Sequence, residues 1–376
     1  MTGTVVLGTG IVGRAAAWDL VRRGHGVVVA DADRTAAAAL AAELGVAWEH
    51  ADAARPETLL ELLRPADLIV SAVPYRLGLG VASAAVDAGT HYLDFGGNPA
   101  VVAEQLALDE AARRAGVAVI PDCGLAPGFA NVLAEADIAA LGGGPIERVA
   151  LRVGALPAEP TGALGYQLAF SPEGLINEYA EPCEVLRDGR LTTVEPLTEL
   201  EQVEWDDWGP LEAFHTAGGS SALARRWEGR VAHLDYKTLR YPGHGSIFRA
   251  LYEIGMFDEA PRRYGEATVS RRAVLLEALR SELPAGAPDV VLVRTWAETG
   301  GSGRRRTAGH QVVDRHDGRF SALARTTAFP ATALADLIAR SVVDAPGART
   351  MGAAVAADDL LPELAQLGLT AVPWVP

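Results

Sequence analysis

In the first third of the chain, short apolar runs alternate with segments of helical periodicity. Runs of roughly four to eight apolar residues are typical of strands buried on both faces, and apolar residues three and four apart are typical of helices that cover them. The strands are expected at 4–7, 27–30, 46–48, 67–75, 91–95 and 117–121, and the helices at 15–21, 34–44, 80–88 and 99–115. This alternation predicts a doubly wound parallel sheet, a Rossmann domain, over residues 1–122.

The pattern changes after a junction rich in glycine and proline at 121–131 and a second breaker at 142–145. Expected strands then follow one another with fewer helices between them, at 149–154, 165–170, 184–186, 231–241, 290–298 and 307–316. Such a run favours a mixed or antiparallel sheet. We therefore expect an α/β chain with a second, α+β domain at 123–330 for substrate binding and oligomerisation. A C-terminal helix and tail at 331–376 are expected to return to the Rossmann domain.

The first apolar run leads directly into Gly8-x-Gly10-x-x-Gly13, and a helical pattern follows. Between a strand and a helix, this spacing is typical of dinucleotide binding. The first glycine allows a tight turn, the second lets backbone N–H groups approach a pyrophosphate, and the third lets helix and strand pack closely. Asp31 ends the second run about 20 residues later, where a carboxylate accepts the ribose hydroxyls of NAD. We predict NAD as the cofactor and NADP as the poorer one, because its phosphate would meet Asp31.

Further ligand contacts are expected where parallel strands end, since open α/β sheets bind ligands at that edge. The cofactor contacts expected in addition to the glycines and Asp31 are Ile11, Val12, Asp52, Ser71, Val73 and Pro74. Tyr75 and Asn98 follow two of these strands and are candidate substrate contacts. Each position has a simpler alternative: Asp52 could cap the next helix, and segments 71–75 and 94–98 could be ordinary turns.

The second domain offers polar groups suited to a zwitterionic substrate. Ser171-Pro172-Glu173 has the form of a helix start, and Asn177 lies four residues after Glu173 on the same face. A carboxylate beside an amide suits a cationic ligand, although capping alone accounts for the serine. The glycine-rich segment His215–Ser221, which includes Thr216, offers hydroxyl and backbone donors for a carboxylate. Arg240 is a further candidate for substrate binding.

Lys237 is the only lysine in the chain, and all other permanently basic side chains are arginine. Strand alternation places it on one face with Tyr241, and Arg240 on the other. Arginine cannot act as a base at neutral pH, whereas a desolvated lysine can. Amine oxidation needs such a base, because hydride leaves a carbon only when its nitrogen is neutral. Lys237 is our candidate base, assisted by Tyr241 or Asp122; the alternative is a lysine retained by chance.

Composition narrows the class of protein. A hydrophobic fraction of 49% among 376 residues is ample for buried cores, and no apolar run approaches the roughly 18 residues of a membrane helix. The net charge of −15 argues against nucleic acid or an anionic membrane as partner. Two cysteines are too few for a disulfide framework, and no histidine spacing indicates a metal site. The low number of cysteines indicates a reducing, cytoplasmic location. Since the first expected strand begins at Thr4, we expect no signal peptide.

Several motifs resemble a known family. The Rossmann start is accompanied by Ser71-Ala-Val-Pro-Tyr75, Gly124-Leu-Ala-Pro-Gly128, the segment 165–179 and Thr238-Leu-Arg-Tyr241. Together they resemble the saccharopine dehydrogenase superfamily over nearly the whole chain. Within it, segments 91–98, 122–128, 171–179, 215–219 and 236–244 are most similar to the L-lysine 6-dehydrogenase family. That resemblance implies NAD-dependent oxidative deamination of the ε-amine of lysine, a semialdehyde that cyclises to piperideine-6-carboxylate, and a homo-oligomer such as a dimer.

Three positions depart from the saccharopine reductases. The resemblance implies arginine there at the position of Glu173, aspartate at that of Ala126, and no lysine at that of Lys237. These differences favour a diamino acid over a substrate with several carboxylates. The alternatives are a saccharopine-type or carboxynorspermidine-type reductase that joins an amine to a carbonyl compound, and a dinucleotide-binding regulator without catalytic activity.

Overall fold

The computed structural model describes residues 3–300, 305–344 and 346–376 and divides into two compact units. Unit 1 comprises residues 1–136, 221–223 and 324–370, and unit 2 comprises 137–220, 224–323 and 371–376. Unit 1 thus continues beyond the expected boundary at residue 122, and the chain rejoins it before the expected residue 331. None of the helices in these described ranges has both the length and the apolar character needed to cross a membrane.

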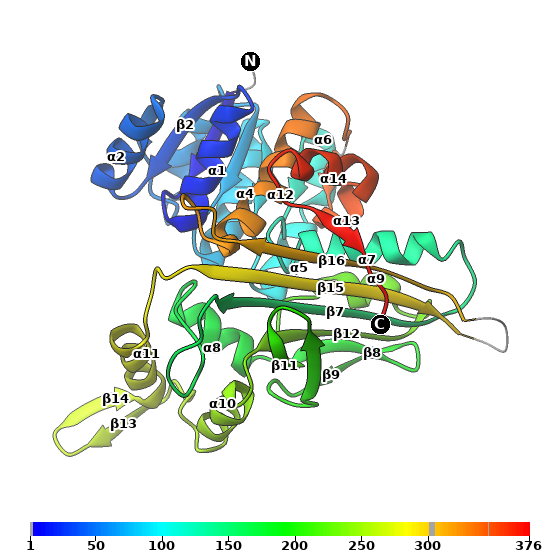
Figure 1. The fold of residues 1–376 in the computed structure, drawn as a ribbon. Helices are drawn as coiled ribbons and strands as arrows, with labels where there is room; N and C mark the ends of the chain where they lie inside the picture. Colours follow the sequence, from blue (N-terminus) through cyan, green and yellow to red (C-terminus); the bar gives the residue numbers. More distant parts are fainter. Residues whose placement is uncertain (1–2, 301–304, 345) are drawn as a thin grey trace. The chain divides into compact units, whose positions relative to one another are not determined.

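A parallel sheet forms the centre of unit 1 (Figure 1). In the described part of the chain it has seven strands in the order β17-β6-β5-β4-β1-β2-β3, and every neighbouring pair is parallel. The strands are β1 (Gly3–Leu7), β2 (Gly26–Asp31), β3 (Ala47–His50), β4 (Leu68–Ser71), β5 (His91–Asp94), β6 (Ala118–Ile120) and β17 (Gly347–Ala348). The predicted doubly wound Rossmann sheet is confirmed.

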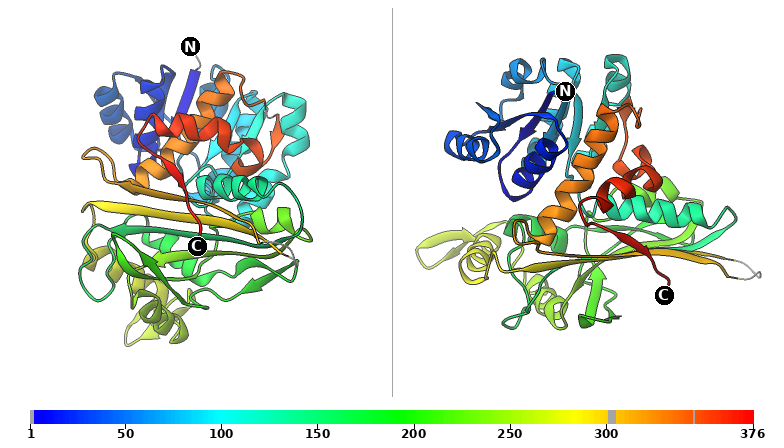
Figure 2. Two further views of the ribbon diagram at one scale, coloured as in Figure 1. Left: turned by 45° about the vertical axis from the view of Figure 1, so that its right-hand side comes forward. Right: turned by 45° about the horizontal axis from the view of Figure 1, so that its top comes forward.

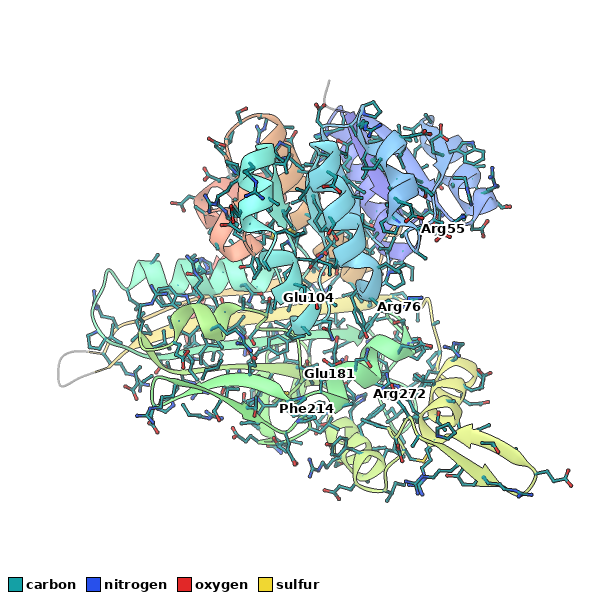
Figure 3. The ribbon with its side chains drawn as sticks, turned by 180° about the vertical axis from the view of Figure 1, so that it is seen from behind. Arg55, Arg76, Glu104, Glu181, Phe214 and Arg272 are labelled. Atoms are coloured by element: carbon teal, nitrogen blue, oxygen red, sulfur yellow. The ribbon has the colours of Figure 1, made fainter. Side chains whose placement is uncertain are left out.

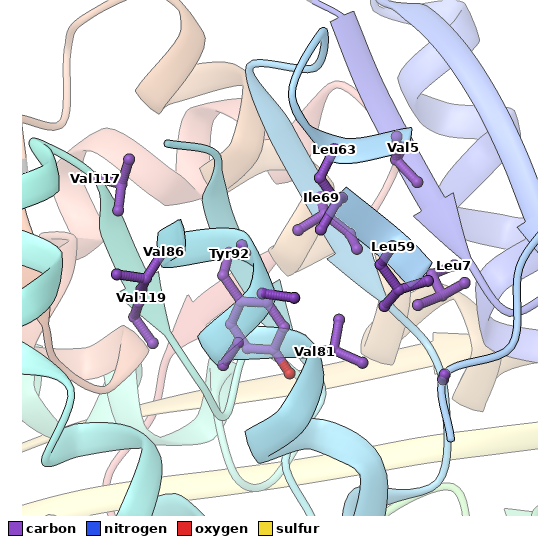
Figure 4. Packing of buried hydrophobic residues seen from close by; sticks show 14 of the residues in the cluster. Val5, Leu7, Leu59, Leu63, Ile69, Val81, Val86, Tyr92, Val117 and Val119 are labelled. Atoms are coloured by element: carbon purple, nitrogen blue, oxygen red, sulfur yellow. The ribbon is translucent and has the colours of Figure 1, made fainter. Parts of the chain in front are cut away.

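Helices cover this sheet, and buried side chains of strands and helices form one cluster between them. The helices and 3-10 turns of unit 1 are α1 (Ile11–Arg22), α2 (Arg34–Leu44), η1 (Pro56–Leu59), α3 (Leu60–Leu63), η2 (Tyr75–Leu77), α4 (Gly78–Ala88), α5 (Pro99–Leu106), α6 (Asp109–Ala115), α13 (Met351–Ala354) and α14 (Ala357–Ala365). Val5, Ile69, Val81 and Val119, from strands and one helix, pack together with Tyr92 in the core (Figure 4). The expected single helix at 99–115 is instead two helices, since acidic Asp109 and Glu110 open a new first turn in α6.

The last part of the chain packs on unit 1 through α12 (Ala322–Ala339), which lies beside the sheet in both views of Figure 2. Thr332 donates a hydrogen bond to the buried carboxylate of Asp19 in α1, with 2.6 Å between the oxygens. The rings of Trp18 and Phe329 lie 6.1 Å apart beside it. These contacts hold the C-terminal helix against the first helix of the Rossmann fold.

Unit 2 contains a mixed sheet, as predicted. Its path is β10-β11-β12-β7-β15-β16-β18, and β8 pairs with β12 and carries β9 as its other neighbour. β12 and β7 are parallel, and the other pairs are antiparallel. The strands are β7 (Ile146–Pro157), β8 (Cys183–Arg187), β9 (Arg190–Val194), β10 (Glu201–Trp205), β11 (Gly209–His215), β12 (Val231–Arg240), β15 (Asp289–Thr299), β16 (Thr307–Arg315) and β18 (Ala371–Pro373). A separate hairpin joins β13 (Pro261–Tyr264) and β14 (Ala267–Ser270).

The helices of this part of the chain are α7 (Phe129–Ala140), which begins in unit 1, and α8 (Pro172–Ala180), α9 (Leu223–Trp227), α10 (His244–Glu253) and α11 (Arg271–Glu282). The strand expected at 165–170 is wrong: this segment is irregular apart from one isolated bridge at Leu168. Its aromatic residues pack into the cluster of buried side chains around α8 and α10 instead of forming a ladder. Burial of aromatic side chains gives the same apolar signal in a loop as in a strand.

Candidate functional site

The glycine turn between β1 and α1 has the geometry of a dinucleotide loop. Gly8 has a φ of +101°, and a Cβ there would lie 2.7 Å from the carbonyl oxygen of Ala72. A Cβ on Gly13 would lie 1.9 Å from the carbonyl oxygen of Gly8, so helix and strand require glycine at both positions. A Cβ on Gly10 would meet no atom within 4 Å. The middle glycine therefore leaves the loop open to a ligand.

A cleft of about 200 Å³ lies beside this turn, entirely within unit 1. Its lining brings together many of the residues predicted to contact the cofactor, namely Gly8, Gly10, Asp31, Asp52, Val73 and Pro74. Ile11 is largely exposed in the first turn of α1, followed by the half-buried Val12. The free N–H groups of that turn suit an anion. Ser71 is buried at the end of β4 and does not line the cleft.

Two carboxylates line the cleft. Asp31 accepts hydrogen bonds from the backbone and hydroxyl of Thr9, at 2.7 and 2.8 Å, and from the backbone of Asp33 at 2.9 Å. Burial opposes ionisation of Asp31, but these bonds from Asp33 and Thr9 keep its pKa below the ordinary value. Asp52 accepts the backbone N–H of Ala54 at 2.9 Å in the turn before η1. The Asp52 carboxylate also pairs with Arg55 at 3.2 Å, so the negative charge without a cationic partner at this edge of the cleft is that of Asp31.

The two predicted substrate contacts in unit 1 have local roles. Tyr75 is half-buried and begins η2. The side-chain oxygen of Asn98 accepts the N–H groups of Ala100 and Val101 at 3.0 and 3.1 Å, as the N-cap of α5. Ordinary turn and capping chemistry, the simpler alternative, accounts for the position of this amide.

Asp122, a predicted catalytic residue, is a buried acid beside a second one. Its φ is +62°, and its backbone N–H donates to the carboxylate of Asp94 at 3.1 Å. Ser221 donates a hydrogen bond to one carboxyl oxygen of Asp122, and no described residue bonds the other oxygen. Burial, with the negative charge of Asp94 adding to it, raises the pKa of Asp122 well above its ordinary value. Burial and the neighbouring carboxylate of Asp94 therefore both favour the protonated form of Asp122.

In unit 2, the predicted alternation of β12 is found. Arg240 bonds the hydroxyl of Tyr179 on one face of the sheet, whereas Lys237 bonds Glu201 of β10 on the other. Lys237 Nζ lies 2.9 Å from the Glu201 carboxylate and 2.6 Å from the carbonyl oxygen of Glu199. The Tyr241 hydroxyl instead donates to the carbonyl of Pro157 at 3.0 Å. The expected assistance of Lys237 by Tyr241 is absent from these contacts, and Lys237 is a donor in an ion pair.

Arg240 is held by a chain of hydrogen bonds. Its Nε donates to the Tyr179 hydroxyl at 2.9 Å, and that hydroxyl lies 3.0 Å from Nε2 of His244. Nδ1 of His244 lies 3.0 Å from the carbonyl oxygen of Leu164. Burial, with the charge of Arg240, lowers the pKa of His244 to about 3, so the ring is neutral. Its Nδ1–H donates to Leu164, and its Nε2 accepts from Tyr179.

Arg240 is buried but keeps unused donors, and its positive charge interacts with the carboxylate of Glu178. Nη1 donates to the carbonyl of Leu239 at 2.9 Å, and within the described ranges the other terminal nitrogen has no acceptor. Glu178 of α8 is half-buried, and in the same ranges its carboxylate has no hydrogen bond. Burial raises the pKa of Glu178 to about 7 even though Arg240 opposes the shift. Tyr166, whose ring lies 5.2 Å from the guanidinium carbon, packs beside them.

The other predicted substrate contacts are engaged elsewhere. Glu173 is half-exposed and pairs with Arg280 of α11. Asn177 accepts a hydrogen bond from Arg272, which Figure 3 labels near α8. Thr216 is buried, and its hydroxyl oxygen lies 2.7 Å from that of Thr238. Glu173 and Asn177 thus connect α8 to α11.

Sequence reasoning missed Glu178, Tyr179 and His244. Glu178 and Tyr179 belong to the segment 171–179 that was singled out, and His244 ends the segment 236–244. The burial of Tyr179, whose ring lies 5.8 Å from that of Phe214 (labelled in Figure 3), sets the phase of α8. Leu175, Ile176 and Tyr179 form the apolar face of α8. This helical spacing would have shown that Glu178 lies beside the buried face.

Comparison with known proteins assigns both parts of the chain to one family. Residues 4–120 match the saccharopine dehydrogenase NADP binding domain, and residues 124–369 match the saccharopine dehydrogenase C-terminal domain. A mitochondrial alpha-aminoadipic semialdehyde synthase of Rattus norvegicus is 28% identical over 212 residues, which cover 54% of this chain and 22% of the relative. A saccharopine dehydrogenase [NADP(+), L-glutamate-forming] of Pyricularia oryzae is 25% identical over 200 residues, which cover 51% and 44%. The chain spans less than half the length of these curated relatives.

Two solved structures share the fold. A saccharopine dehydrogenase (L-Glu forming) from Saccharomyces cerevisiae aligns over 100% of both chains with a TM-score of 0.82 at 18% identity. A homospermidine synthase from Legionella pneumophila in complex with NAD aligns over 100% of this chain and 91% of its own, with a TM-score of 0.72 at 11% identity. At these identities the likeness concerns the fold. The family matches do not single out the L-lysine 6-dehydrogenases, but they confirm the wider resemblance: the chain belongs to the saccharopine dehydrogenase family.

Proposed function

We propose that this protein is an NAD-dependent dehydrogenase that oxidatively deaminates the ε-amine of L-lysine or a close diamino acid. The products would be the semialdehyde, which cyclises, together with NADH and ammonia. The observation that carries the proposal is the pairing, in one unit, of a fixed arginine that has donors to spare with a half-buried carboxylate that has no hydrogen-bond partner. A cation and an anion that interact electrostatically suit a substrate that carries both charges.

Arg240 is the proposed anchor for the α-carboxylate. A guanidinium binds a carboxylate through two parallel N–H groups, which fixes orientation as well as position. The chain through Tyr179 and His244 supports this role, because it holds Nε and so fixes the plane of the guanidinium. Since His244 is neutral, it adds no charge that would compete for the carboxylate.

Glu178 is the proposed base. A substrate ammonium gives its proton to the Glu178 carboxylate, and the neutral nitrogen then allows hydride to leave the adjacent carbon. A nicotinamide dinucleotide held by the glycine turn and Asp31 would supply the acceptor of that hydride. Water adds to the resulting iminium, and ammonia leaves the aldehyde. A pKa of about 7 suits a base that works near neutrality. The ion pair of Lys237 with Glu201 does not favour this role for the lysine, so we do not assign it there.

The test of the base uses Glu178→Gln, which keeps the shape of the side chain and removes the base. Removal of a general base typically lowers the rate by about 10²–10⁴-fold. The matched control is Glu173→Gln, on the same helix but half-exposed and paired with Arg280. A hydride-transfer rate that is unchanged in Glu178→Gln in stopped-flow measurements would refute the assignment.

NAD is the proposed cofactor. The carboxylates of Asp31 and Asp52 both line the cleft, and Asp31 is held ionised by Thr9 and Asp33. A 2′-phosphate would lie against negative charge, whereas ribose hydroxyls would donate to it. The names of the matching N-terminal domain family and of the Pyricularia relative include NADP, whereas the homospermidine synthase structure holds NAD. Asp31, whose partners are neutral donors, is therefore the specific argument for NAD in this chain.

The alternative is a reductase that joins an amine to a carbonyl compound, as the names of the saccharopine dehydrogenase and homospermidine synthase relatives suggest. Arg240 would serve a carboxylate of either substrate type. Turnover of lysine, ornithine, saccharopine and polyamines with NAD and NADP separates the two. Reduction of NAD by a diamino acid alone supports the dehydrogenase, and a strict requirement for a carbonyl compound supports the reductase.

A further inference from the structure

A second cavity of about 390 Å³ lies within unit 2, and Lys237 and Asp235 of β12 line it. These side chains lie on the face of β12 opposite to Arg240, so the cavity is separate from the proposed substrate site. Its lining also includes Arg148 of β7 and Arg187 of β8, and only one lining residue, Val149, is apolar. The volume suits a small molecule, and the charged lining excludes an apolar one.

Two of the three acids of this cavity already hold cations, whereas the third, Glu147, is exposed and its carboxylate lies 3.9 Å from a ring nitrogen of His233. Asp235 accepts Nη1 of Arg152 at 2.7 Å; burial opposes its ionisation, but Arg152 outweighs burial and keeps its pKa at about 2. Glu199 accepts a hydrogen bond from Arg187 at 2.6 Å, and its carboxylate lies 3.1 Å from a ring nitrogen of His215. The buried acid, Asp235, is therefore already paired, and the acceptor oxygens that remain belong to the exposed side chains of Glu147 and Glu199.

The cations, in contrast, keep unused donors. Lys237 is 4% exposed, and its two bonds, to Glu199 and Glu201, leave its third N–H free among the described residues. The guanidinium of Arg148 lies 5.6 Å over the ring of Trp296, and its nearest carboxylate, that of Asp235, is 3.8 Å away. This distance is too long for a hydrogen bond.

The backbone beside Lys237 is strained. Leu197 and Glu199 have φ values of +59° and +50°, a region that residues other than glycine adopt at a cost. The bond from Lys237 to the Glu199 carbonyl holds one of these residues in place. Residues with such backbone conformations are common at ligand-binding sites, where contacts with the surrounding structure stabilise the conformation.

We propose that this cavity binds the oxyanion of a small organic acid, held by Lys237, Arg148 and Arg187. Charge-assisted bonds from a buried ammonium and two guanidinium groups suit a carboxylate, and they suit a phosphate group equally. The site is independent of the proposed function, because none of its residues belongs to the Arg240 site. An occupant here is an effector or an accessory ligand of the enzyme, not its substrate.

Isothermal titration calorimetry on the full chain tests this proposal, with succinate and inorganic phosphate as separate probes. Wild-type protein should bind one of them, and Arg148→Gln should weaken that binding by about tenfold or more, as expected for the loss of a charged hydrogen bond. The matched control is Arg315→Gln: Arg315 lies 5.5 Å over Trp208, with a carboxylate 3.7 Å away, and does not line the cavity.

Lys237→Gln should also weaken binding, but it removes support from Glu199 as well. Arg148→Gln leaves that bond intact and therefore decides the outcome. Tighter binding of succinate identifies a carboxylate ligand, and tighter binding of phosphate identifies a phosphorylated one. The proposal is overturned if wild-type protein binds neither anion, or if Arg148→Gln and Arg315→Gln bind the anion equally well.

Discussion

Replacement of Asp31 by asparagine should shift the cofactor preference toward NADP. The carboxylate of Asp31 lines the dinucleotide cleft and is held ionised by Thr9 and Asp33. A 2′-phosphate charge about 5 Å from a carboxylate would be repelled by about 3 kcal/mol at an effective dielectric constant of 20. Solvent at this half-buried edge reduces the penalty to roughly 1.5–2 kcal/mol, which is a factor of about 10–30 in binding.

The assay is the ratio of kcat/KM for NAD to that for NADP, at fixed ionic strength, in wild-type and Asp31→Asn protein. The ratio should fall by about 10–30-fold, partly through weaker binding of NAD, since one acceptor for the ribose is lost. Asp33→Asn is the control, because it removes a charge from the cap of α2 without changing the lining of the cleft. An unchanged ratio in Asp31→Asn, or equal use of both cofactors by wild-type protein, would refute the electrostatic reasoning.

Three further predictions concern the two sites. Gly10→Ala should fold with an unchanged Tm, because its Cβ meets no protein atom. It should bind NAD weakly in fluorescence titration, because Gly10 lines the cleft and the added methyl group would take up space there. Gly13→Ala should lose folded protein, because its Cβ would lie 1.9 Å from a carbonyl oxygen. Arg240→Lys should raise KM for lysine by roughly 10–100-fold through loss of the bidentate contact, whereas Arg249→Lys, a partly exposed arginine over Tyr252, should leave KM unchanged. Glu178 must be ionised to act as the base, so kcat/KM should fall as pH drops below about 7, and Glu178→Gln should lack this limb of the pH profile.

The Rossmann unit could be predicted from the sequence because its signals are local. The glycine turn, the apolar runs and Asp31 are close together in the chain, and each has its effect through neighbours in the same strand–turn–helix unit. The cleft then brings Gly8, Gly10, Asp31 and Asp52 together. The prediction of substrate contacts from strand ends was less specific. Asn98 follows a strand as expected, but its side-chain oxygen caps α5.

The second unit was predicted less well because its contacts are long-range. Alternation placed Lys237 and Arg240 on opposite faces of β12, but it could not show which face meets a ligand. The partner of Lys237 is Glu201, in the strand β10 that was not predicted. The partner of Arg240 is Tyr179, 61 residues earlier in the chain. The packing of β12 near β10 in the sheet and against α8 decides these partners, and neither propensity nor spacing encodes it.

An assay of the reaction itself is the most direct test of the proposed function. Purified protein is incubated with L-lysine and NAD, without any carbonyl compound, and NADH and ammonia are measured in the same sample. The proposed function predicts equal amounts of the two products in wild-type protein and a loss of both in Glu178→Gln. Formation of neither product from L-lysine or ornithine, with turnover only when a carbonyl compound and a reduced cofactor are supplied, would contradict it.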